Sequence, residues 1–187
     1  MKKVNKSRYA ILGMLFDQPL SGYELRKRML SSTTYFWNET DASVYPMLRI
    51  LEEEGMVTAK TEFVGKRARK VFTITQAGKD DVTAWLALPA EQEHPRSELL
   101  LKLFFGAFVC KEITIKQLEQ RLQQCQETQK TFKTIENEIA QAPDTHPQKL
   151  FWELSVRRGT IDVEATITWL NECLERLKRN NEKKIQN

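Results

Sequence analysis

The sequence predicts a mainly α-helical protein in two parts: three helices and a two-stranded β-hairpin come first, and helices alone follow. Three observations predict this fold. Apolar residues recur at helical spacing in both parts. A helix that ends at Gly55 is followed by a strand and a turn at 65–70 with four cations in five residues. Apolar residues also repeat every seven positions over residues 118–177. A helix followed by a basic hairpin is typical of a winged helix-turn-helix, in which the helix enters the major groove and the hairpin contacts phosphates.

The length of 187 residues suits one large domain or two small ones. We place the boundary in the polar segment Pro89–Pro95. Residues 1–90 then form a winged-helix DNA-binding domain, and residues 91–187 form a helical dimerisation domain that could also take an effector. The net charge is +4, and residues 1–88 hold the whole excess, with 14 basic side chains against 10 acidic ones. That asymmetry favours an N-terminal domain that meets a polyanion.

The remaining bulk features predict a cytoplasmic protein without cofactor, metal or membrane partner. No run of about 18 apolar residues is present, and no signal core follows the N-terminal lysines. Cys110, Cys125 and Cys173 show no CxxC spacing, so we expect buried structural thiols, with a redox switch as the alternative. The two histidines, each before a proline, support neither metal binding nor acid–base catalysis.

The first two helices have clear local signals. Ser7–Phe16 is predicted as a short amphipathic helix, and Asp17 ends it. Ser21 is a good N-cap, and Glu24 three residues later completes a capping box for a helix over Gly22–Leu30.

The start of the next helix depends on Pro46, which lacks an N–H group and fits only the first turn. With Ser43 as N-cap, Pro46 is the third helical residue, whereas a cap at Asp41 would strain or bend the start. Gly55 is a natural C-terminal stop. Strands follow at Met56–Phe63 and Lys70–Ile74.

After the strands, Thr75 is predicted to cap a helix that ends near Leu86. In the second part, Ser97 caps an apolar helix over Glu98–Cys110, and Thr114 with Gln117 forms a capping box that opens a helix to about Ala142. The last helix covers about 148–179. The seven-residue repeats are Leu118, Cys125, Phe132 and Ile139 on one helix, and Val156, Val163, Leu170 and Leu177 on the other. They predict an antiparallel helical hairpin with apolar surface left for a partner subunit.

The basic turn and the start of the reading helix are the candidate DNA contacts. Cations on a hairpin tip can reach phosphates, although an isolated basic turn is often just a solvated loop. Hydroxyls at the helix start can donate to phosphate oxygens. Asp41 either caps the helix or accepts from a cytosine amino group. The predicted DNA contacts are Ser43, Tyr45, Arg49, Gly65, Lys66, Arg67, Arg69 and Lys70.

Aromatic side chains offer a second candidate site. Trp37, Phe105 and Trp152 could line a pocket for a planar effector, while the alternative is that such residues are simply part of the core.

Together these segments resemble the PadR family of bacterial transcriptional regulators. Seven segments in order carry the resemblance: Tyr9–Leu15, Ser21–Leu25, Phe36–Trp37, Ser43–Leu48, Leu51–Val57, Gly65–Phe72 and Thr75–Gly78. Residues 97–105 resemble the opening of the C-terminal helical domain of the longer PadR proteins and of a related virulence activator. The resemblance implies a homodimer joined through its C-terminal helices, repression at a roughly palindromic operator, and in some members a phenolic effector between the two domains.

The sequence therefore predicts a homodimeric, DNA-binding transcriptional repressor that a small phenolic or aromatic effector could release. The alternative is a winged-helix protein-interaction module without specific DNA binding, for which Glu39, Asp41 and the acidic run 52–54 argue, whereas the basic hairpin argues against it. No nucleophile motif, phosphate loop or paired carboxylates indicate an enzyme.

Overall fold

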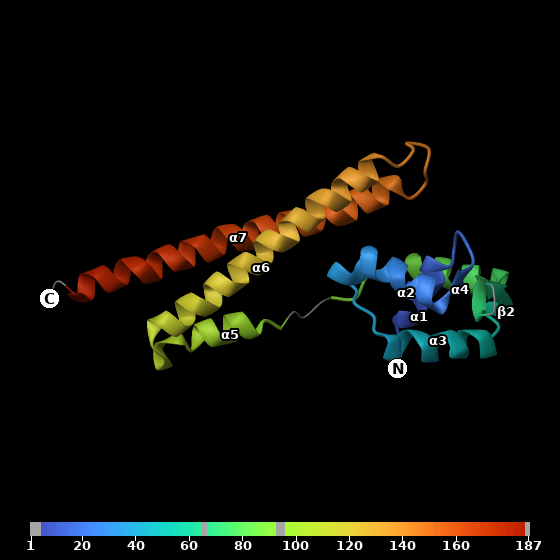
Figure 1. Cartoon of the computed structure of the whole chain (residues 1–187), viewed down its shortest axis with the longest axis horizontal. Coiled ribbons are helices and arrows are strands. Elements are labelled where there is room, and N and C mark those ends of the chain that lie inside the picture. Colours follow the sequence, from blue (N-terminus) through green and yellow to red (C-terminus); the bar gives the residue numbers. More distant parts are fainter. Residues whose placement is uncertain (1–4, 65–66, 93–95, 186–187) are drawn as a thin grey trace. The chain divides into compact units, whose positions relative to one another are not determined.

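The computed structural model describes residues 5–64, 67–92 and 96–185, and it divides the chain into two compact units, Met1–Glu93 and His94–Asn187 (Figure 1). Each unit is described by itself below. The elements of the first unit are α1 (Ser7–Met14), β1 (Leu20–Ser21), α2 (Gly22–Ser31), the 3-10 helix η1 (Thr33–Tyr35), α3 (Asp41–Glu53), β2 (Val57–Val64), β3 (Arg67–Ile74) and α4 (Gln76–Leu86). The elements of the second are α5 (Glu98–Phe104), the 3-10 helix η2 (Gly106–Phe108), α6 (Lys111–Ala140) and α7 (Lys149–Ile185).

The first unit packs its helices around one apolar core. α3 buries Val44, Met47, Leu48 and Leu51, as the helical spacing predicted. The core also takes Ile11, Leu12, Leu15, Leu20, Leu25, Met29, Val57, Phe72, Ile74 and Val82. The opposite side of α3 is left at the surface.

Two predicted caps are confirmed. The Ser21 hydroxyl accepts from the Glu24 amide at 3.3 Å, while the Glu24 carboxylate accepts from the Ser21 amide at 2.9 Å. Thr75 accepts from the amide of Gly78 at 3.1 Å and opens α4.

The predicted start of α3 is wrong. The helix begins at Asp41 with Thr40 as N-cap, and Ser43 lies at the third helical position, where it closes a capping box with Thr40. Pro46 is therefore inside the helix and has no N–H group to donate to the carbonyl of Ala42, four residues earlier. Ala42 and Pro46 are both exposed, so the missing hydrogen bond costs less here than it would in the core.

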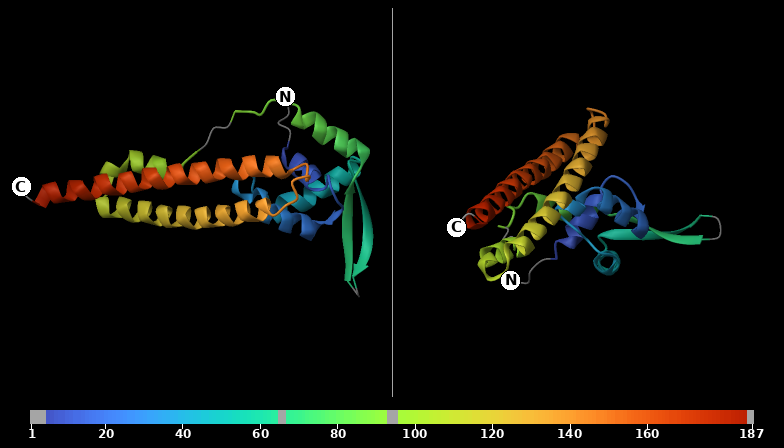
Figure 2. Two further views of the ribbon diagram at one scale, coloured as in Figure 1. Left: turned by 90° about the horizontal axis from the view of Figure 1, so that it is seen from above. Right: turned by 60° about the vertical axis from the view of Figure 1, so that its left-hand side comes forward.

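The sheet has three strands in the order β1-β3-β2, all antiparallel, so the prediction of a two-stranded hairpin alone was incomplete. β1 is only two residues long, with Leu20 opposite Phe72. So short a strand shows no alternation in sequence. β2 and β3 pair from Val57 opposite Ile74 to Val64 opposite Arg67, and Figure 2 shows this hairpin projecting from the helices of its own unit.

The hairpin strands are longer than predicted. Arg67, Arg69 and Lys70 belong to β3 and not to the turn, because cross-strand pairing continues out to Arg67. Gly65 and Lys66, the predicted turn residues, lie outside the described residues.

The second unit is an antiparallel hairpin of α6 and α7, with α5 beside it (Figures 1 and 2). Most members of the seven-residue repeats lie in its core: Leu118, Cys125, Phe132, Val163 and Leu170 are buried there together with Leu174. Val156 and Leu177 pack against them, and Ile139 is not part of this core. Ser97 caps α5, as predicted, by accepting from the amide of Leu100 at 3.2 Å.

Three predictions for this unit are wrong. α5 ends at Phe104 and not at Cys110, because the chain turns through η2 at Gly106. α6 begins at Lys111, so Thr114 is a buried residue within the helix and not its cap. Of the three thiols, Cys125 is buried and Cys173 partly buried, but Cys110 is exposed.

None of the described helices is long and apolar enough to cross a membrane. In the same part of the chain, no three His, Cys, Asp or Glu side chains come together as a metal site would require.

Candidate nucleic-acid interface

The exposed side of α3 forms a continuous face. Ala42, Tyr45, Pro46 and Arg49 recur at helical spacing and are all exposed. Tyr45 is 43% exposed, whereas Val44 beside it is fully buried. Within the described ranges, Arg49 has no ion-pair partner, so its guanidinium is available to a ligand. A helix held by its buried side and offering Tyr45 and Arg49 outward has the geometry of a reading helix.

The position of the Tyr45 ring depends on Gly22 at the start of α2. A Cβ atom on Gly22 would lie 2.5 Å from Cε1 of Tyr45, so only glycine lets the ring lie against this backbone. The contact between α2 and α3 therefore holds in place one of the predicted DNA-contact residues.

The Ser43 hydroxyl is engaged inside the protein. It lies 2.5 Å from Oε2 of Glu39 and 2.8 Å from the carbonyl oxygen of Thr40, and it accepts from the Thr40 amide at 3.0 Å. These bonds fix the first turn of α3. Contact of Ser43 with DNA stays a prediction.

Glu39 is the centre of this arrangement and was missed from the sequence. Its side chain is only 5% exposed, and it accepts from Nε1 of Trp37 at 2.7 Å and from Ser43. Burial alone would raise the pKa of Glu39. Hydrogen bonds from Ser43, Ser7 and Trp37, with the charge of Arg26, outweigh burial and hold the pKa below its ordinary value. The carboxylate is thus an ionised clamp between the ends of α1 and α3.

Two cations of β3, Arg69 and Lys70, already have carboxylate partners. Arg69 lies between two of them, at 2.7 Å from Glu24 and 2.9 Å from Glu62. The hydrogen bond to Glu62 and the charge of Glu24 raise the pKa of Arg69 above its ordinary value. Lys70 lies 2.6 Å from Glu52 at the end of α3.

Asp41 is the first residue of α3 and not its N-cap, so the interpretation of Asp41 as the cap was wrong. Its carboxylate lies 2.9 Å from Nε of Arg26 on α2. The acidic group at the start of the reading helix is therefore compensated within the unit.

Phe105 and Trp152, two of the three residues predicted to line one effector pocket, lie far apart in the second unit. Phe105 precedes Gly106, which lines a hollow together with Leu177 of α7. Trp152 lies 25 positions before Leu177 on the same helix. At a rise of 1.5 Å per residue, the backbones of Trp152 and Leu177 are about 38 Å apart. Trp152 contacts His146 at a ring distance of 4.6 Å. Trp37 belongs to the first unit, where it donates to Glu39.

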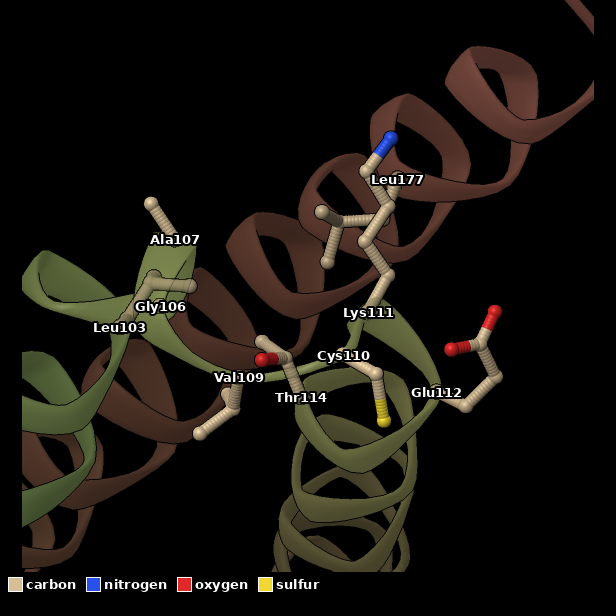
Figure 3. A pocket seen from close by; sticks show the side chains of 9 residues that line it. All are labelled: Leu103, Gly106, Ala107, Val109, Cys110, Lys111, Glu112, Thr114 and Leu177. Carbon is tan, nitrogen blue, oxygen red and sulfur yellow. The ribbon is translucent and has the colours of Figure 1, made fainter. Parts of the chain in front are cut away.

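A surface hollow of about 600 Å³ lies where η2 meets the start of α6 and the last part of α7 (Figure 3). It is lined by Leu103, Gly106, Ala107, Val109, Cys110, Lys111, Glu112, Thr114 and Leu177. None of the predicted pocket aromatics is among them.

The second unit also exposes many large apolar side chains. On and after α5 these are Leu100, Leu101, Phe104, Phe105 and Phe108, and on α7 they are Leu150, Phe151, Leu154 and Ile161. Phe104 and Phe108 are more than four-fifths exposed, at 82% and 84%. So much apolar surface in one unit is typical of an interface.

Two family models match consecutive parts of the chain. Residues 11–84 match the transcriptional regulator PadR-like family, and residues 95–178 match the virulence activator alpha C-terminal domain. The chain belongs to the PadR-like family of transcriptional regulators. The resemblance read from the sequence is thereby confirmed.

Two curated relatives are similar in sequence to this PadR-like chain. The negative transcriptional regulator PadR of Bacillus subtilis is 34% identical over 100 residues, which are 52% of this chain and about half, 55%, of that protein. A probable transcriptional regulator of Mycobacterium tuberculosis is 28% identical over 182 residues, 91% of this chain and 96% of that protein.

Solved structures share the predicted fold, a winged helix followed by a helical domain. Bacillus subtilis PadR in complex with operator DNA has a TM-score of 0.81 at 22% identity, over 92% of this chain and 99% of that one. The same protein with p-coumaric acid has a TM-score of 0.76 at 23% identity, over 93% and 99%. The Vibrio cholerae virulence activator AphA has a TM-score of 0.73 at 26% identity, over 92% and 98%.

Proposed function

We propose that this PadR-like regulator is a cytoplasmic, homodimeric repressor that binds a roughly palindromic operator. Residues 1–90 act as the DNA-binding domain and residues 91–187 as the dimerisation domain. The observation that carries the proposal is α3, which buries one side in the core and presents Tyr45 and Arg49 on the other, beside a projecting hairpin. Membership of a family of transcriptional regulators supports it.

In this proposal α3 enters the major groove and the hairpin follows the phosphates. Arg49 is the described cation on the exposed face of α3 that is free to bind a base edge or a phosphate. Tyr45 donates its hydroxyl, and Ser43 contributes through the first turn that it holds. Gly65, Lys66, Arg67, Arg69 and Lys70 form the wing that contacts the backbone.

The exposed apolar side chains of α5, η2 and α7 would be covered by the second copy of the chain. A two-fold dimer then presents two reading helices about 34 Å apart, one turn of DNA, which matches a palindromic operator.

A small aromatic effector is part of the proposal. It is supported by the solved complex of Bacillus subtilis PadR with p-coumaric acid. Because Phe105 and Trp152 lie far apart on one protomer, at most one of them lines a given site there. The effector releases DNA only if it binds one arrangement of the dimer more tightly than the other.

The test is a fluorescence-anisotropy titration of the full chain against DNA from immediately upstream of its own coding region, with a scrambled duplex as competitor. We expect tight, salt-sensitive binding that the scrambled duplex does not displace. Absence of binding to either duplex at low salt would contradict the proposal and favour the protein-interaction module. The same assay, with hydroxycinnamic acids added, tests the effector.

A further inference from the structure

Carboxylates on the first unit pair with Arg69 and Lys70, two of the cations that the wing would offer to DNA. We propose that Glu24, Glu52 and Glu62 act as intramolecular competitors of the DNA phosphates and thereby set the affinity of this protein for DNA that lacks its operator. The inference rests on the proposed function, because it concerns the same face of the molecule.

The geometry brings these acids from three elements to two cations of β3. Glu24 of α2 and Glu62 of β2 hold Arg69 from two sides, at 2.7 and 2.9 Å. Glu52, in the last turn of α3, holds Lys70 at 2.6 Å. Three negative charges thus face two positive ones, so this part of the wing has no excess positive charge.

The pairs are exposed and can exchange. The side chain of Arg69 is 41% exposed and that of Lys70 is 50% exposed. Pairs of this kind are weakly held, since solvent screens the charges and both side chains lose rotamer freedom. A phosphate can therefore replace a carboxylate on either cation without loss of the fold.

The exchange leaves a negative charge beside the DNA. When Arg69 turns to a phosphate, Glu24 and Glu62 lose their partner and repel the same backbone. Because these carboxylates stay close to the DNA, a phosphate contact by Arg69 releases fewer counterions in total than a contact by a cation without acidic neighbours would. Binding to non-operator DNA comes almost wholly from phosphate contacts, so its free energy is weakened in full by this repulsion. Binding to the operator also gains from base contacts of α3, which the repulsion does not affect.

Arg49 provides the contrast on the same unit. It is exposed on the reading face of α3 and, among described residues, has no carboxylate partner. An unpaired cation thus lies on the helix that reads bases, whereas Arg69 and Lys70, on the strand that meets phosphates, are both paired.

The experiment compares the wild-type chain with the double variant Glu24→Gln, Glu52→Gln. Glutamine at position 24 keeps an oxygen that can accept from the Ser21 amide, so the capping box is retained. The probe is a labelled duplex of random sequence, titrated by anisotropy between about 50 and 200 mM salt. The matched control is Glu119→Gln, Glu175→Gln, which makes the same change in net charge at exposed ion pairs with Lys178 and Arg179 in the second unit.

We expect the double variant to bind the random duplex about three- to thirtyfold more tightly, with a steeper dependence on salt, and the control to bind like the wild type. Unchanged or weaker binding by the double variant, or an equal gain by the control, would overturn the proposal. If the wild type prefers its operator and the double variant gains nothing, the competition alone fails. If neither protein binds any duplex, the proposed function fails with it.

Discussion

Glu39 offers the sharpest test of how the reading helix is held. Its carboxylate accepts from Nε1 of Trp37 at 2.7 Å and from the Ser43 hydroxyl, and the side chain is 5% exposed. Glu39→Ala removes both acceptors and leaves the indole N–H of Trp37 without its partner. Ser43 still has the carbonyl oxygen of Thr40 at 2.8 Å as an acceptor.

The magnitude follows from these contacts. A hydrogen bond to a charged group contributes about 1.5–3 kcal/mol, and a buried donor left unpaired costs a similar amount. Since Ser43 recovers one acceptor, Glu39→Ala should lower the free energy of unfolding of the first unit by about 2–3 kcal/mol. Glu39→Gln keeps one acceptor oxygen and should cost about 1–2 kcal/mol.

The assay is a urea titration of the full chain at constant protein concentration. The chain has four tryptophans, so we would replace Trp152 and Trp169 by Phe in every protein compared. Fluorescence then reports on Trp37 and Trp85 in the first unit. A parallel titration with operator DNA should show weaker binding by Glu39→Gln, because the first turn of α3 loses an anchor.

The pH dependence gives the sign of the effect. Hydrogen bonds hold the pKa of Glu39 below its ordinary value of about 4.3, so the ionised form stabilises the folded state. That contribution is complete above the ordinary value and is lost as the pH falls through the lowered one. The difference in stability between wild type and Glu39→Gln should therefore be constant near neutral pH and shrink below about pH 4. A difference that does not change with pH would refute the role of the ionised Glu39 carboxylate in stabilising the folded state.

Two further predictions concern the wing and the reading helix. Changing Lys66 and Arg67 together to Ala should weaken binding to all duplexes alike. For a dimer, the slope of log binding constant against log salt concentration should fall in magnitude by up to about four; an unchanged slope in anisotropy titrations would refute the assignment of these residues to the wing. Gly22→Ala should displace the Tyr45 ring, because the added Cβ would lie 2.5 Å from it. The affinity for operator DNA should fall severalfold, while the free energy of unfolding changes by less than about 1 kcal/mol. Gly13→Ala, where a Cβ meets nothing within 4 Å, is the control and should bind like the wild type.

Several parts of the fold could be predicted because their causes lie within a few residues. Ser21 with Glu24, Thr75 and Ser97 each cap a helix through an amide three residues away. The buried side of α3 and the core of the α6–α7 hairpin follow from spacing along a single helix. The cap of α3 was not predicted: Ser43 and Asp41 were the alternatives considered, and the structure places Thr40 there, with Pro46 inside the helix.

The candidate site was only half predictable. The spacing of α3 identifies Tyr45 and Arg49 as outward-facing, and composition alone identifies the basic hairpin. The partners of that hairpin are invisible in sequence, since Glu24 and Arg69 lie 45 positions apart, and Lys70 and Glu52 lie 18 apart. Glu39 accepts from near neighbours, Trp37 and Ser43, but its burial and its interaction with Ser7 of α1 depend on the tertiary fold.

The sequence by itself therefore determined which segments form the main helices and the hairpin, the outward face of the reading helix and the resemblance to the PadR family, which depend on local propensity and periodic burial. Only the tertiary structure decided that β1 joins the sheet, that Glu39 is buried, and that Arg69 and Lys70 are shared with three carboxylates. Each of these depends on packing between segments distant in the chain. Charge pairing and burial depend on distance in space, which spacing along the chain does not encode.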